Sequence, residues 1–116
     1  MSESIIKVKS FELAISGVNF YKYLVTEKKE FVMSKQFLRS ITSVGANVRE
    51  AVNAQSKPDF IHKLSISLKE ANETEYWIDL LFETKYLSQS EFEFIKPKNV
   101  ELLKLLTSII NTSKKT

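Results

Sequence analysis

The side chains best suited to bind phosphate are five cations between residues 35 and 63. Lys35, Arg39 and Arg49 recur at helical spacing, so a helix over this segment places them on one face. Lys57 and Lys63 follow in the next segment. Such cations bind RNA or DNA through backbone charge, and no base-reading motif accompanies them here. Any nucleic-acid binding is therefore expected to show little sequence preference.

Arg39 has an alternative, structural role. It can be tied to a carboxylate of the following helix, such as Glu73, and its position next to a stripe of short polar residues favours this role. Arg49, Lys57 and Lys63 are then the better candidates for phosphate contact.

The residues that could hold a metal ion or act in catalysis form no complete set. His62 is the only histidine, and the chain has no cysteine. Asp59 and His62 are three residues apart, a loose version of the Glu-x-x-His pairs of di-metal bundles, but on one helix only. We expect an exposed His62, no metal, no cofactor and no enzyme activity. A set of carboxylates on the third helix also lacks a partner with an evident catalytic role: Glu70, Glu73, Glu75, Asp79 and Glu83.

Short polar residues lie at helical spacing where a plain bundle would carry apolar ones. Mid-helix Ser43 and Asn47 are poor helix formers, which indicates another use. We expect a structural hydrogen-bond network between helices or between subunits, with Asn47 between helices. Gly45, in the same segment, allows a neighbouring backbone to approach closely. The predicted members of the network are Ser43, Asn47, Glu50 and Glu73.

Apolar periodicity predicts four helices with short connections. The first three span residues 3–26, 32–54 and 57–85, and the fourth begins after Ser88. Ser56 is a predicted N-cap, and Ser88 forms a predicted capping box with Glu91. Pro97 is expected to kink or interrupt the fourth helix, and residues 111–116 are expected to fray. The predicted fold class is all-α: an antiparallel up-down-up-down four-helix bundle in which residues 1–116 form one domain.

The first and fourth helices are apolar over more of their circumference than a bundle requires. In the first helix, one set of apolar residues follows the helical period: Ile5, Val8, Phe11 and Ile15, continuing through Val18 to Val25. A second set widens this stripe: Ile6, Leu13, Phe20 and Tyr23. Self-association is the simplest way to cover the surplus.

Composition and charge exclude several classes of protein. Hydrophobic residues make up 43% and charged residues 27%, as in ordinary globular chains, and two Gly and two Pro are too few for a sheet with many turns. No apolar run approaches the roughly 18 residues of a membrane span, and the N-terminus lacks a signal-peptide pattern, so a cytoplasmic location is expected. Residues 1–69 carry a net charge of +5 and residues 70–116 a net charge of −2, an asymmetry compatible with a polyanion-binding surface.

Nearly the whole chain, from Phe11 to about Lys115, resembles a bacterial family, most strongly over Lys28 to Ala51 and Gln55 to Leu81. The family comprises four-helix-bundle proteins related to the 23S rRNA intervening-sequence protein. Many members carry Pro where this chain has Gly45. The matching residues, in order, are Gln36 and Arg39, the run from Ser43 to Glu50 (Ser-Val-Gly-Ala-Asn-Val-Arg-Glu), Ser56, Asp59-Phe60, and then Glu70, Glu73 and Glu75.

The resemblance implies a non-enzymatic accessory protein that assembles into a closed homopentamer of up-down bundles. Some similar proteins are encoded within intervening sequences of ribosomal RNA genes, and in a related branch the pentamer binds nucleic acid and a reverse transcriptase. The implied partners are further copies of the chain, RNA or DNA, and a nucleic-acid-processing protein. An oligomeric protein-interaction scaffold with no nucleic-acid role is the alternative. A salt-titrated binding assay separates the two.

Overall fold

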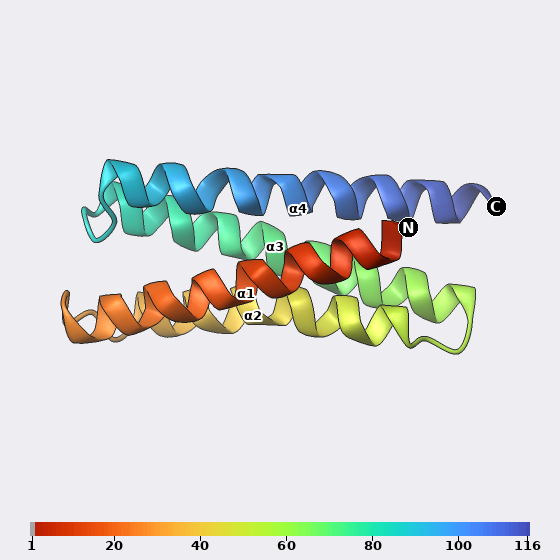
Figure 1. Cartoon of the computed structure of the whole chain (residues 1–116), viewed down its shortest axis with the longest axis horizontal. Helices are drawn as coiled ribbons and strands as arrows, with labels where there is room; N and C mark the ends of the chain where they lie inside the picture. The colour runs from red at the N-terminus through yellow and green to blue at the C-terminus, as the bar shows by residue number, and fades with distance from the viewer. Residues whose placement is uncertain (1) are drawn as a thin grey trace.

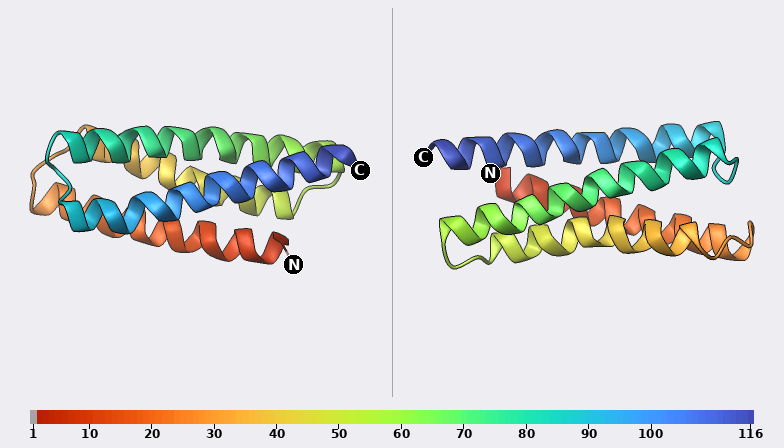
Figure 2. Two further views of the ribbon diagram at one scale, coloured as in Figure 1. Left: turned by 90° about the horizontal axis from the view of Figure 1, so that it is seen from above. Right: turned by 180° about the vertical axis from the view of Figure 1, so that it is seen from behind.

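Four helices run up and down along a shared long axis in the computed structural model, which describes residues 2–116 and their side chains from residue 5 onward. They are α1 (Ser2–Thr26), α2 (Met33–Val52), α3 (Lys57–Glu83) and α4 (Gln89–Lys115) (Figure 1). Each helix lies beside the next, and α4 returns to lie beside α1 (Figure 2). The body measures 46 × 20 × 19 Å. The predicted all-α antiparallel bundle is confirmed.

Apolar side chains from all four helices meet in one core. Leu13 from α1, Phe37 from α2, Ile78 from α3 and Leu106 from α4 are almost completely excluded from solvent. Burying a side chain of this size stabilises a fold by about 1.5–3 kcal/mol. These residues recur at helical spacing within their segments, which is why the periodicity predicted the helices.

The orientation of α1 differs from the simplest reading of its sequence. The bundle buries Ile6 and Leu13 of the second apolar set and Leu24 of the first set. The first set is exposed only over its N-terminal half, from Ile5 to Ile15. Both sets follow the period of a helix, so periodicity alone cannot say which of them meets α2 and α4. The surplus apolar surface predicted for α1 therefore lies on its outward face. On α4, Phe94 is the one exposed large apolar residue among those described, at 50% exposure.

Two glycines allow α1 and α2 to pack closely. A Cβ atom at Gly17 would collide with the side chain of Ile41, and one at Gly45 would lie 3.1 Å from the backbone oxygen of Ser10. The expected close approach at Gly45 is confirmed. Gly17 of α1 likewise allows the close approach of Ile41 from α2.

The predicted helix starts of α3 and α4 are confirmed. The Ser56 hydroxyl accepts a hydrogen bond from the Asp59 amide at 3.2 Å. Ser88 and Glu91 form the full capping box, because each side chain accepts a hydrogen bond from the other residue's backbone amide.

The start of α2 depends on a residue that sequence analysis did not single out. The Glu30 carboxylate accepts hydrogen bonds from the amides of Ser34 (2.6 Å), Met33 (3.0 Å) and Val32 (3.1 Å). Burial alone would raise the pKa of this carboxyl. The three backbone amides and the Ser34 hydroxyl outweigh it, so the pKa lies below the ordinary value of 4.5.

Two expectations for α4 are wrong: the helix is not interrupted at Pro97, and it extends to Lys115 instead of fraying after residue 110. A kink at Pro97 stays a prediction. Pro97 removes the amide that would bond to the carbonyl of Glu93, and both residues are exposed, so water can satisfy that carbonyl.

Candidate nucleic-acid interface

Three of the five predicted phosphate-binding cations share the exposed face of α2. Lys35, Arg39 and Arg49 are all exposed and lie along a stripe about 21 Å long, at 1.5 Å per residue. None of the three has a carboxylate within ion-pair distance among the described side chains. The predicted tie between Arg39 and Glu73 is therefore wrong. Glu73 instead accepts a hydrogen bond from the indole of Trp77 at 3.3 Å.

The other two cations lie apart from this stripe, on α3. The Lys63 ammonium is 3.7 Å from the Glu50 carboxylate, which reduces its local charge. The Lys57 ammonium donates a hydrogen bond to the Thr116 hydroxyl at 2.6 Å and so lies against the end of α4. The structure thus brings together Lys35, Arg39 and Arg49, and separates Lys57 and Lys63 from them.

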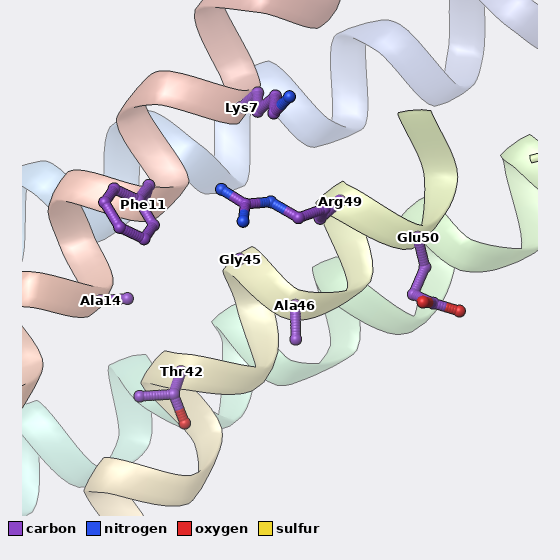
Figure 3. A pocket seen from close by; sticks show the side chains of 8 residues that line it. All are labelled: Lys7, Phe11, Ala14, Thr42, Gly45, Ala46, Arg49 and Glu50. Atoms are coloured by element: carbon purple, nitrogen blue, oxygen red, sulfur yellow. The ribbon is translucent and has the colours of Figure 1, made fainter. Parts of the chain in front are cut away.

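A groove of about 410 Å³ lies between α1 and α2, beside the Arg49 end of the stripe (Figure 3). The Arg49 guanidinium extends toward α1 and lies 5.4 Å from the centre of the Phe11 ring. Lys7 lies one turn before Phe11 on α1, above the Arg49 guanidinium in the view of Figure 3. Small side chains leave the middle of the groove open. The lining residues are Lys7, Phe11, Ala14, Thr42, Gly45, Ala46, Arg49 and Glu50.

Lys7 and Phe11 were not predicted from the sequence as groove residues. Phe11 belongs to a periodic apolar stripe, and Lys7 has no neighbour in sequence to suggest a role. The only available signal was the surplus of apolar residues on the first helix, which requires some of them to face outward.

The outward face of α1 carries large apolar side chains over about three turns. Ile5, Val8, Phe11 and Ile15 are 47%, 55%, 53% and 48% exposed. Large apolar side chains exposed to this degree on one helix are a common feature of surfaces that bind another molecule.

The predicted polar network does not form within the chain. The Ser43 hydroxyl donates to the Arg39 carbonyl at 2.7 Å, and the Asn47 amide donates to the Ser43 carbonyl at 2.9 Å, so both residues bond to their own helix. The expectation that Asn47 lies bonded between helices of one chain is wrong. Of the four predicted members, only Glu50 contacts a charged side chain of another helix, the Lys63 ammonium of α3. A network between subunits stays a prediction.

Part of the carboxylate set on α3 has a structural role. The Lys96 ammonium of α4 lies 2.5 Å from Asp79 and 3.4 Å from Glu75. Burial alone would lower the pKa of Lys96, but these two carboxylates outweigh burial and raise it above the ordinary value. His62 is exposed, as predicted. Across the described residues, no three His, Cys, Asp or Glu side chains lie close enough to hold a metal ion.

The model of the 23S rRNA-intervening sequence protein family matches residues 2–108. The chain belongs to this family. It is similar to a crystal structure described as a protein of unknown function from the S23 ribosomal protein family of Bacteroides thetaiotaomicron VPI-5482, with 58% sequence identity and a TM-score of 0.93. That match covers 96% of this chain and 99% of the other. Among curated proteins, none matches the chain.

The two segments that carried the resemblance form α2 and α3, which pack directly against each other. Besides the ion pair of Glu50 with Lys63, two polar contacts between these helices come from buried residues. The Ser67 hydroxyl donates to the Val44 carbonyl at 2.7 Å, and the Thr74 and Ser40 hydroxyls lie 3.0 Å apart. None of the described helices is long and apolar enough to cross a membrane.

Proposed function

We propose that this protein is a non-enzymatic, homo-oligomeric accessory protein that binds RNA or DNA through backbone charge. The observation that carries the proposal is the stripe of Lys35, Arg39 and Arg49. These three cations share one exposed helix face, and none is neutralised by a carboxylate among the described side chains. Glu50, the one acidic residue of α2, is engaged by Lys63. A row of uncompensated cations attracts phosphates irrespective of base sequence.

Assembly is the second part of the proposal. Ile5, Val8 and Ile15 are the residues of the outward face of α1 that do not line the groove with Phe11. They would lose contact with water if this part of α1 packed against another copy, and each Å² of apolar surface so buried contributes about 25 cal/mol. A closed pentamer is the arrangement that the family resemblance implies. In such a ring the cations of α2 are repeated in every copy, which enlarges the basic surface. A cytoplasmic location belongs to the same proposal, because RNA and DNA are available there.

The test is a salt titration of binding to short RNA and DNA oligonucleotides. For the wild type we expect the logarithm of affinity to fall with the logarithm of salt concentration, with a slope of about −2 to −3 for each engaged stripe. The triple variant Lys35→Glu, Arg39→Glu, Arg49→Glu should abolish binding and leave the oligomer mass unchanged.

A matched control has the same change in charge at exposed lysines away from α2: Lys69→Glu, Lys98→Glu, Lys104→Glu. It should weaken binding far less than the stripe variant, because only the general field of the protein changes. Equal losses in the two variants would show that net charge, and not the stripe, governs binding.

An oligomeric protein-interaction scaffold is the second candidate. The apolar face of α1 favours it, because this surface suits a protein partner, such as a nucleic-acid-processing protein, better than a polyanion. If the wild type binds neither RNA nor DNA at low salt, the scaffold is the better account.

A further inference from the structure

We infer that the groove between α1 and α2 binds a single strand of RNA or DNA, with one unpaired base stacked on Phe11 and the adjoining phosphates at Arg49 and Lys7. The inference rests on the proposed nucleic-acid binding and adds the strandedness of the ligand and the residue that selects it.

Phe11 offers an aromatic surface in an unusual place. Its ring is 53% exposed and forms a wall of the groove, next to small residues of both helices such as Ala14 and Gly45. Stacking on an exposed aromatic side chain is the main sequence-independent way in which proteins hold unpaired bases. The groove volume of about 410 Å³ lies within the range of small-ligand sites, so a base can enter.

The cations beside the ring supply the complementary charge. The Arg49 guanidinium faces the Phe11 ring, and a planar guanidinium can itself stack on a base or bind phosphate in a bidentate manner. Lys7 lines the same groove. Neither cation has an ion-pair partner among the described side chains, and the one carboxylate in the groove, Glu50, lies 3.7 Å from Lys63.

The position of the ring within the groove favours single strands over duplexes. Bases of a duplex are stacked on each other and paired, so their faces cannot reach a ring between two helices. The cations of α2 outside the groove contact backbone phosphates of either form. Phe11 therefore contributes to the affinity for single strands only.

A second exposed aromatic residue provides an internal comparison. Phe94 on α4 is 50% exposed and has the Lys98 ammonium 4.7 Å from its ring centre. The groove beside it is lined by two lysines, Lys9 and Lys98, and by two carboxylates, Glu12 and Glu101, so the groove has no excess of positive charge. Lys9 is also paired with Glu101 at 3.2 Å. Phe94 resembles Phe11 in being about half exposed and in having a cation beside its ring. Its groove lacks an excess of positive charge, so we expect Phe94 to bind no base.

The experiment measures the affinity of the intact protein for an oligo(dT) strand, an oligo(U) strand and a DNA duplex of equal length. Phe11→Leu keeps an apolar side chain but removes the aromatic face. It should weaken both single strands on the order of tenfold and leave the duplex unchanged. Phe11→Trp should retain wild-type affinity, and Phe94→Leu should change nothing.

Three results would overturn the inference. If Phe11→Leu binds single strands as the wild type does, the ring is not a stacking platform, and the basic stripe can still be correct. If Phe11→Leu lowers the oligomer mass, Phe11 belongs to the subunit interface. If the wild type binds no nucleic acid at all, the proposed function falls together with the inference.

Discussion

Glu30 shows how one side chain can define the beginning of a helix. It lies in the connection between α1 and α2 and uses both carboxylate oxygens on three amides of the first turn of α2. Its negative charge also faces the positive end of the helix dipole. The lowered pKa means that folding favours the ionised form. Its stabilising contribution is therefore complete above about pH 4.5 and is lost as the pH falls through the lowered folded-state value.

Replacing Glu30 by Gln should lower the free energy of unfolding by about 1 kcal/mol at pH 7, because the cap loses its charge and one acceptor oxygen. The difference from the wild type should shrink as the pH falls below 4.5, where the wild-type carboxyl becomes protonated as well. Urea unfolding at pH 7 and pH 3 measures both. The exposed Glu27→Gln serves as control and should be neutral at either pH. A difference that is the same at both pH values would contradict the capping role.

At the scale of the element, the crossing of α1 over α2 determines whether replacing a glycine raises or lowers the stability of the protein. Helix propensity alone predicts that Gly17→Ala stabilises the protein by up to about 1 kcal/mol. The collision of the new Cβ atom with Ile41 predicts the opposite, a loss of about 1–3 kcal/mol, because a packed core yields little. Thermal or urea unfolding distinguishes the two signs. Gly45→Ala should cost less, since its Cβ would be 3.1 Å from the Ser10 oxygen. A more stable Gly17→Ala would mean that the helices are farther apart than described.

At the scale of the whole molecule, the outward face of α1 predicts assembly. Light scattering at micromolar concentration should give a mass several times that of the 13.4 kDa chain. The double variant Val8→Asp, Ile15→Asp should reduce the mass to that of one chain, because burying two carboxylates in an apolar interface is strongly unfavourable. Val32→Asp is the control, since this exposed apolar residue lies at the end of the bundle and not on the α1 face. A wild type that scatters as a single chain would remove the assembly proposal.

Features that depend on near neighbours in the chain could be predicted from spacing and local motifs. Spacing over a few residues and local motifs predicted the helices, the family and the caps at Ser56 and Ser88. They also predicted that Lys35, Arg39 and Arg49 share one helix face. A helix period and a cap use contacts three or four residues apart, so the relevant geometry is already set by the backbone.

Features that depend on residues far apart in the chain could be recognised only from the packing of the helices. The sequence allowed either apolar set of α1 to face the core, and the packing against α2 and α4 buries Ile6 and Leu13 of one set and Leu24 of the other. The way α2 and α3 lie against each other determines that Lys63 forms an ion pair with Glu50. It also determines that Arg39 forms none with Glu73. The groove that joins Phe11 to Arg49 exists only where α1 crosses α2. Pairings across the bundle are set by packing between segments, for which spacing along the chain carries no direct signal.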